Sequence, residues 1–196
     1  MKPQHQLVFL LKSYSQDFEL AARMVASFHK FNQDQIPLFI VVPDSDQKLF
    51  EPLLEEGVTL ILESRFGEYL VSEPVHGMRA GYINQEIIKL SFWELGLTEN
   101  YFCVDSDAEF IRPFTVADFM FDPETPYSVL VQDLELAVEP AYYSQYWQSR
   151  EKEITHIADL LDLDPRVILT CHGHQVFSTQ VLESFRNDFL APRGWS

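Results

Sequence analysis

The stretch QLVFLLKSYSQDFELAARMVASFHKFNQDQIPLFIVV (residues 6–42) predicts a strand, a helix and a second strand in succession. Residues 6–14 and 37–42 each hold an apolar run of strand length. Between them, residues 17–32 place apolar side chains at i, i+3, i+4, i+7 and i+10, which is the spacing of one helical face. These apolar residues are Phe18, Ala21, Ala22, Val25 and Phe28. A strand–helix–strand unit of this kind is typical of parallel sheets.

The same alternation continues through the rest of the chain. Strands are expected at 58–64, 101–105 and 127–133, with 167–171 as a further candidate, and helices at 46–57, 81–96, 140–162 and 178–190. The pattern predicts a single α/β domain over residues 1–196, with a mostly parallel sheet flanked by helices. In such sheets ligands bind beyond the carboxyl ends of the strands. Neither G-x-G-x-x-G nor G-x-x-x-x-G-K-[ST] occurs, so neither a dinucleotide oxidoreductase nor a P-loop enzyme is supported.

The charge balance of the chain restricts its partners. Thirty acidic residues against 14 basic ones give a net charge of −16. Such a surface repels a nucleic-acid backbone and an anionic membrane, so neither is an expected partner. A nucleotide ligand would need positive charge at its site, and a divalent cation is the most direct source.

The cysteines and the N-terminus suggest a cytoplasmic protein. Cys103 lies inside an apolar run, which favours a buried free thiol over a disulfide. The apolar part of the N-terminal segment covers only five residues, which is too short for a secretory signal or a membrane span. We therefore expect a reducing compartment and no transmembrane segment.

The pattern D-x-D occurs three times, and two of its copies have simple structural explanations. Asp44-Ser45-Asp46 follows a strand and directly precedes the helix expected at 46–57, so Asp44 or Ser45 is predicted to be its N-cap. The copy in LLDLDPR (residues 160–166) ends a helix before Pro165, where contact with water suffices.

The copy Asp105-Ser106-Asp107 follows a strand but does not precede a helix, because AEFIRPF has extended character. In extended backbone, Asp105 and Asp107 project to the same side. Two carboxylates at the end of a buried strand repel each other unless a cation lies between them. Oxygen ligands favour Mg²⁺ or Mn²⁺, which leave positions open for phosphates. The alternative is a solvated turn after the strand.

Gln85 and Lys89 lie four residues apart on the preceding helix and share one of its faces. A lysine in an otherwise apolar helix needs an anionic partner or a route to water. Because this helix leads into the strand before Asp105, Lys89 is expected to meet those carboxylates or a bound diphosphate.

The segment GYINQEIIKLSFWELGLTENYFCVDSDAEFIRPF (residues 81–114) resembles a family of bacterial proteins that are commonly catalogued as having unknown function. Its members look like glycosyltransferases of the GT-A fold. The family pattern is a helix of the type (Q/N)Q-x-x-K-L, a short linker, an apolar strand, D-S-D and then x-x-F-x-R-P-F. The residues that match it are Asn84, Gln85, Lys89, Leu90, Asp105, Ser106, Asp107, Phe110, Arg112, Pro113 and Phe114. The resemblance extends over residues 6–190 and implies a single GT-A-like, Rossmann-related domain.

The resemblance also implies a nucleotide-sugar site. Asp107 would be the first ligand of Mn²⁺ or Mg²⁺, and Asp105 would contact the metal, its waters or the ribose. The other residues expected to bind substrate are Ser13, Tyr14 and Asp17 near the base, Gln85 and Lys89 in the donor pocket, and Ser106, His174 and Gln175. His172 is a candidate further metal ligand, although a loop histidine is more often structural. Asp133 is a candidate acceptor-side base, with a solvated strand end as the alternative.

The leading functional hypothesis is therefore a metal-dependent transferase that moves a sugar from a nucleotide diphosphate to an unknown sugar, lipid or protein acceptor. Related proteins continue beyond the position of Ser196, so the chain is expected to lack a C-terminal segment. That expectation supports an alternative, a degenerate module that binds nucleotide or sugar without catalysis. A phosphatase of the haloacid-dehalogenase type is the third candidate. Its first Asp lies near the N-terminus and precedes Thr or Val and Gly, whereas here Ala-Glu-Phe follows a mid-chain motif.

Overall fold

The computed structural model describes residues 5–128, 130–131, 139–162, 170–171 and 174–195. The chain divides into two compact units. The first comprises Met1–Tyr127 and Gly173–Ser196, and the second comprises Ser128–His172. Each unit is described by itself.

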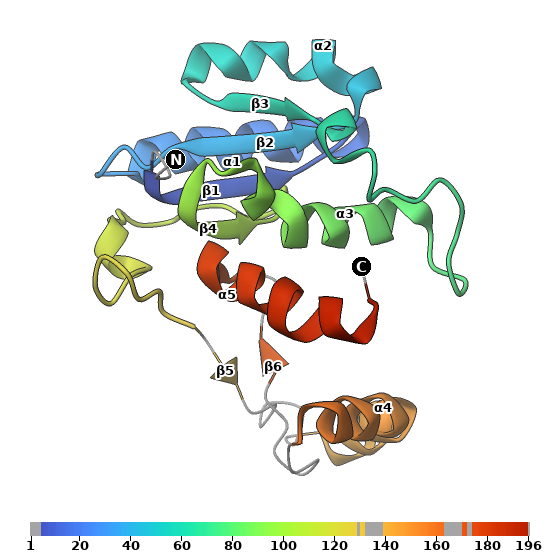
Figure 1. The fold of residues 1–196 in the computed structure, drawn as a ribbon. Coiled ribbons are helices and arrows are strands. Elements are labelled where there is room, and N and C mark those ends of the chain that lie inside the picture. Colours follow the sequence, from blue (N-terminus) through green and yellow to red (C-terminus); the bar gives the residue numbers. More distant parts are fainter. Residues whose placement is uncertain (1–4, 129, 132–138, 163–169, 172–173, 196) are drawn as a thin grey trace. The chain divides into compact units, whose positions relative to one another are not determined.

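The first unit is built on a five-stranded sheet with the order β3-β2-β1-β4-β7. Figure 1 labels the four parallel strands β3, β2, β1 and β4 in this order. Its strands are β1 (His5–Lys12), β2 (Leu38–Val42), β3 (Thr59–Leu62), β4 (Thr98–Val104) and β7 (Val176–Ser178). The first four are mutually parallel, and β7 pairs with β4 in the antiparallel direction. The prediction of an α/β fold with a mostly parallel sheet is confirmed. The short antiparallel strand β7 was not predicted, because a three-residue strand lacks a periodic signal.

Helical segments cover both faces of this sheet. The α-helices of this unit are α1 (Phe18–Phe31), α2 (Gln47–Phe50), α3 (Ala80–Ser91) and α5 (Thr179–Ser184). The described residues of the unit also form the 3₁₀ turns η1 (Ser15–Asp17), η2 (Asp44–Asp46), η3 (Glu51–Glu56), η4 (Glu63–Phe66), η5 (Phe92–Leu95), η6 (Val116–Asp118) and η9 (Ala191–Arg193). The segment η8 (Phe185–Leu190) is π-helical. The single helix predicted at 46–57 is wrong in detail, since only four of its residues are α-helical. Pro52 lies at the start of η3, where it cannot donate a helical hydrogen bond.

The two faces of β1 bury different clusters. Leu7, Phe9 and Leu11 pack with side chains of α1 and α2 in one buried cluster. Val8 and Leu10 belong to a second cluster, which side chains of α3, η5 and β4 complete. This alternation follows from the two-residue period of a strand, and because both faces are covered, β1 is apolar along almost its whole length.

The strand order creates a switch point between β1 and β4. From β1 the chain proceeds to β2 and then to the edge strand β3, and it returns to the other side of β1 as β4. The loops that leave β1 and β4 therefore start side by side and lead to opposite halves of the sheet. In open parallel sheets, this is where a crevice forms and ligands bind.

The second unit contains a two-stranded antiparallel sheet and one long helix. β5 (Leu130–Val131) pairs with β6 (Thr170–Cys171), and α4 spans Pro140–Leu161. The helix ends at Asp162, which has the left-handed φ of 54°. Of the third D-x-D copy, only Asp162 lies within the described residues. No helix in the described part of the chain is long and apolar enough to cross a membrane.

Candidate functional site

A cleft of about 640 Å³ lies at the carboxyl ends of β1 and β4. The loop after β1 contributes Tyr14 and Asp17 to its lining, and the turn after β4 contributes Asp105 and Asp107. The start of α3 supplies a further wall, which includes Gln85, and Pro43 and Glu63 add to the lining from the ends of β2 and β3. Residues predicted from three separate segments are therefore brought together at the switch point of the sheet.

The backbone after β4 differs from the prediction. Residues 105–108 form a turn, in which Ala108 donates its N–H to the carbonyl oxygen of Asp105 at 3.2 Å. The expected extended geometry is therefore wrong. Asp105 and Asp107 nevertheless both line the cleft, because the turn follows directly from the end of β4.

Ser13 and Ser106 join the two loops beneath the cleft. Both side chains are buried, and the Ser106 hydroxyl donates to Ser13 Oγ at 3.0 Å. The bond links positions 93 residues apart at the ends of adjacent parallel strands. Ser106 lines the cleft and Ser13 does not, and the contact between the two was not predicted.

Asp105 lies between two nitrogen-bearing side chains. Lys89 Nζ is 3.1 Å from Asp105 Oδ1 and also 3.7 Å from Glu86 Oε1. On the other side, His174 Nε2 is 3.5 Å from Asp105 Oδ2. Burial acts to lower the pKa of Lys89, but the attraction of Asp105 and Glu86 outweighs it and raises the pKa, so the ammonium form is favoured.

This arrangement confirms the expectation that Lys89 meets the carboxylates after β4. The protein itself supplies one positive charge to the acidic turn, because the Lys89 ammonium is paired with Asp105. A metal ion between Asp105 and Asp107 stays a prediction.

The lining of the cleft is nevertheless acidic. Its carboxylates outnumber its cations by two: Asp17, Glu63, Asp105 and Asp107 against Lys12 and Arg79. Lys12 is paired with Glu63 at 2.9 Å, while Arg79 has no ion pair with another described residue. A diphosphate entering this cleft would meet net negative charge unless a cation accompanied it.

The described residues offer an incomplete metal site. No group of three or more His, Cys, Asp and Glu side chains suited to a metal occurs among them. Asp107 is exposed and has no ion pair with a described residue, so its oxygens are available. Mg²⁺ is commonly held by one or two carboxylates together with substrate phosphates. The donor set of Asp105 and Asp107 fits an ion of that kind, and does not fit a closed structural site.

The remaining predicted residues have other positions. Lys89 and His174 contact Asp105 and do not themselves line the cleft. Gln175 is buried, and its carbonyl oxygen accepts a hydrogen bond from the N–H of Cys103 in β4. Cys103 is buried and free, as predicted. Asp133 and His172 lie outside the described residues.

Several lining residues were not predicted from the sequence, among them Lys12, Glu63, Arg79 and Tyr82. Lys12 is the last residue of β1, and Glu63 directly follows β3. A charged residue at the end of a predicted strand is a local feature that was visible in the sequence. Arg79 and Tyr82 belong to the start of α3, whose approach to β1 no local pattern indicates.

The first Asp-Ser-Asp has a different role from the predicted N-cap. Neither Asp44 nor Ser45 makes a side-chain capping bond, and that prediction is wrong. Asp46 Oδ2 accepts the N–H of Ser15 at 2.7 Å, and Asp44 Oδ2 accepts the N–H of Ser64 at 3.0 Å. Both carboxylates therefore join the loops after β1, β2 and β3 to one another.

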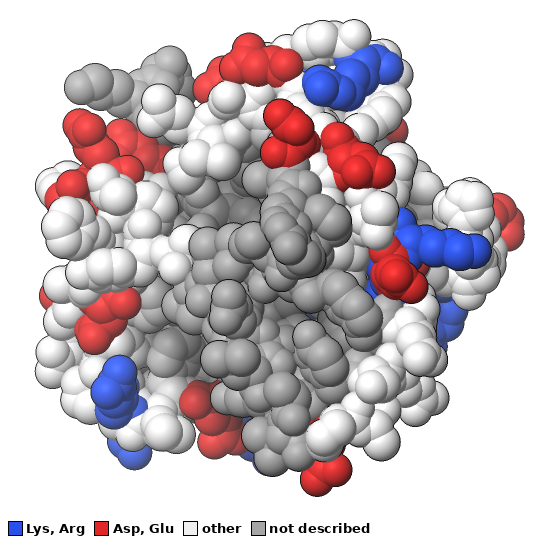
Figure 2. Space-filling view, turned by 90° about the horizontal axis from the view of Figure 1, so that it is seen from below, with Lys and Arg blue, Asp and Glu red and all other residues white. Residues whose placement is uncertain are grey.

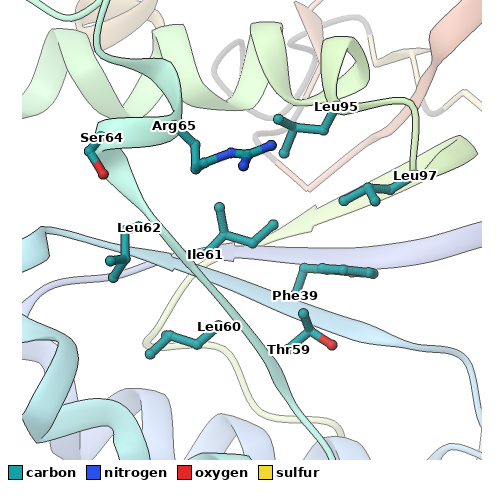
Figure 3. A pocket seen from close by; sticks show the side chains of 9 residues that line it. All are labelled: Phe39, Thr59, Leu60, Ile61, Leu62, Ser64, Arg65, Leu95 and Leu97. Atoms are coloured by element: carbon teal, nitrogen blue, oxygen red, sulfur yellow. The ribbon is translucent and has the colours of Figure 1, made fainter.

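A second cavity of about 410 Å³ lies along the edge strand β3 (Figure 3). Its walls are mainly apolar side chains, among them Phe39, Ile61, Leu95 and Leu97. Arg65 is the charged side chain in its lining. The described lining of this cavity holds no carboxylate, so the acidic residues suited to a metal ion lie in the cleft and not in this cavity.

On the face seen in Figure 2, the Lys and Arg side chains of the described residues are interspersed with Asp and Glu side chains and form no single basic patch in this view.

Comparison with known proteins places the chain in a family. Residues 7–189 match a family model described as "Family of unknown function (DUF6492)". No curated protein matches the chain. The match covers the sheet, the cleft and α4, and it agrees with the resemblance to a family of unknown function. The chain therefore belongs to the family described as DUF6492.

Proposed function

We propose that this protein is a glycosyltransferase of the GT-A type, which takes a sugar from a nucleotide-diphosphate donor with the help of Mn²⁺ or Mg²⁺. The observation that carries the proposal is the position of Asp105 and Asp107. Both line a cleft at the switch point between β1 and β4, where open α/β sheets bind nucleotides and related ligands.

The size and walls of the cleft support a ligand of this class. Its volume of about 640 Å³ lies within the range of small-molecule sites. Tyr14 and Tyr82 both line it and are largely exposed, so their rings are accessible to a base or a sugar. Gln85 adds an amide that can donate and accept hydrogen bonds.

The acidic lining supports the need for a metal. Asp107, together with Asp105, would hold the ion, which would supply positive charge to offset the charge that develops on a leaving diphosphate. Lys89 keeps the carboxylate of Asp105 in place, and the Ser13–Ser106 bond holds the turn against the loop after β1. Arg79 offers a further cation at the rim.

Calorimetric titration with UDP and GDP, each with and without Mn²⁺, tests the proposal. We expect one of the two to bind in the presence of Mn²⁺ and at least tenfold more weakly in its absence. Asp107→Asn should lose the metal-dependent part of the binding, while Asp46→Asn, which alters an identical tripeptide, should keep it. Absence of metal-dependent binding of either nucleotide by the intact chain would remove the proposal.

A second candidate is a module that binds the same ligand without catalysis. The pairing of Lys89 with Asp105 favours it, because one of the two carboxylates is already neutralised inside the protein. Incubation with UDP- and GDP-sugars and detection of the released nucleotide separates the two. Release supports the transferase, and binding without release supports the module.

A further inference from the structure

Lys89 is held in a fixed position beneath the acidic turn. Its side chain is only 7% exposed, and Nζ donates to Asp105 Oδ1 at 3.1 Å. The backbone at the same residue is anchored as well, because the buried Tyr101 hydroxyl donates to the Lys89 carbonyl oxygen at 2.6 Å. The ammonium group therefore belongs to the packed interior between α3 and β4.

A divalent ion and this ammonium group compete for the same carboxylate. A dication bound by Asp105 would lie within a few ångström of Nζ, and like charges at that separation repel strongly. Lys89 cannot move its charge into water without leaving its packed position. Asp105 is therefore a weak metal ligand when no diphosphate is bound together with the metal.

A diphosphate changes this balance. Its negative charges would lie next to the ion and offset the repulsion between the ion and Lys89. The bound metal would then raise the affinity for the nucleotide, and the bound nucleotide would raise the affinity for the metal. By thermodynamic linkage the two affinities rise by the same factor.

We infer that Lys89 is a positioning residue that acts as the internal counter-ion of Asp105, and that it prevents the nucleotide-free protein from binding a divalent ion. Loading of the metal is thereby coupled to arrival of the diphosphate. The inference deepens the proposed function and rests on it for the role of the diphosphate. The exclusion of the metal by Lys89 concerns the nucleotide-free protein alone.

Electron paramagnetic resonance of free Mn²⁺ tests the inference in a titration of the full chain without nucleotide. The wild-type protein should bind Mn²⁺ only at millimolar concentrations. Lys89→Met should bind it about tenfold more tightly, because a unit charge next to the dication is removed. Lys89→Gln should show the same gain and keeps a hydrogen-bond donor for Asp105. Lys89→Arg retains the charge and should remain as weak as wild type.

Two control variants test whether the gain in Mn²⁺ affinity depends on the Lys89–Asp105 pair. Lys48→Gln removes an exposed cation of α2 that does not line the cleft, and it should change the Mn²⁺ affinity by less than threefold. The double variant Lys89→Gln with Asp105→Asn should lose the gain, which shows that the freed carboxylate is the new ligand. Circular dichroism of each variant confirms that it is folded.

The inference is overturned if wild type binds Mn²⁺ at micromolar concentrations without nucleotide. It is also overturned if both neutral variants at Lys89 are folded and remain as weak as wild type, or if their gain persists without Asp105. These titrations contain no nucleotide, so their failure leaves the proposed function standing. Conversely, failure of UDP and GDP to bind would remove the proposed function and leave the result on Lys89 unchanged.

Discussion

The two Asp-Ser-Asp tripeptides, residues 44–46 and 105–107, follow parallel strands of the same sheet and have opposite surroundings. In the first, each carboxylate accepts a backbone N–H from a neighbouring loop. In the second, Asp105 faces Lys89 and His174, while Asp107 faces the cleft. The serines differ as well, since exposed Ser45 donates to Asp46 and buried Ser106 donates to buried Ser13. A pair of Asp residues after a strand can therefore either hold neighbouring loops together or line a cleft.

The largest expected difference between the tripeptides concerns ligand binding. Asp107→Asn removes the carboxylate that is most open to a metal, and it should weaken Mn²⁺-dependent binding of UDP or GDP by about 100-fold. Asp44→Asn should weaken it by less than threefold. Calorimetry on both variants measures the ratio. Equal losses would show that the tripeptides are not functionally distinct.

A smaller effect is expected for stability at the second tripeptide. Lys89→Met leaves Asp105 without its buried partner and should lower the free energy of unfolding by roughly 1–3 kcal/mol. The value lies below that of a fully buried pair because the Asp105 side chain is 36% exposed and partly screened. Urea unfolding measures it. Lys89→Arg serves as the control and should recover most of the loss.

Loss of a hydrogen bond to the backbone should also lower the stability contributed by the first tripeptide. Asp46→Ala removes the acceptor of the Ser15 N–H and should cost about 0.5–1.5 kcal/mol of stability. Hydrogen exchange at the Ser15 amide should become faster in the same variant. Asp107→Ala, at the corresponding position of the second tripeptide, should change stability by less than about 0.5 kcal/mol. The opposite ranking would contradict the roles assigned here.

The smallest effect concerns acid stability. Hydrogen bonds from the Ser64 side chain and backbone lower the pKa of Asp44 below its ordinary value of 3.8. Because the folded-state pKa is the lower one, the stabilisation is present above the unfolded value and is lost as the pH falls through the folded value. Asp44→Asn should therefore flatten the dependence of unfolding free energy on pH below about 4. Urea titrations between pH 5 and pH 2 compare the variant with wild type, and identical slopes would refute the assignment.

Much of the cleft was predictable from local patterns. Tyr14, Asp17, Asp105 and Asp107 all follow predicted strands, and the carboxyl ends of parallel strands meet at one edge of a sheet. Gln85 was assigned to the donor pocket by the family resemblance, since helical spacing shows only that it shares a face with Lys89. The prediction of parallel strands therefore accounts for the residues at the strand ends, and the resemblance accounts for Gln85.

Other parts of the cleft depend on the order of the strands. Glu63 reaches Lys12 because β3 and β1 flank the same strand β2, although 51 positions separate the two residues. Apolar periodicity identifies strands but does not state which ones are neighbours. The charge of Glu63 at a strand end was visible in the sequence, but its place in the cleft follows only from the strand order.

Local residue patterns predicted the four parallel strands, most of the helices and the chemistry at each strand end, and they singled out residues 105–107 as the binding copy, because side-chain periodicity and residue type are local properties. The bonds of Asp44 and Asp46 to the loops after β3 and β1, and the contact of His174 with Asp105, became visible only in the folded chain. Hydrogen bonds and Coulomb attraction depend on distance in space, and the partners that distinguish the two tripeptides come from segments far away in the chain. Ser15 and Ser64 reach the first, whereas Lys89 and His174 reach the second.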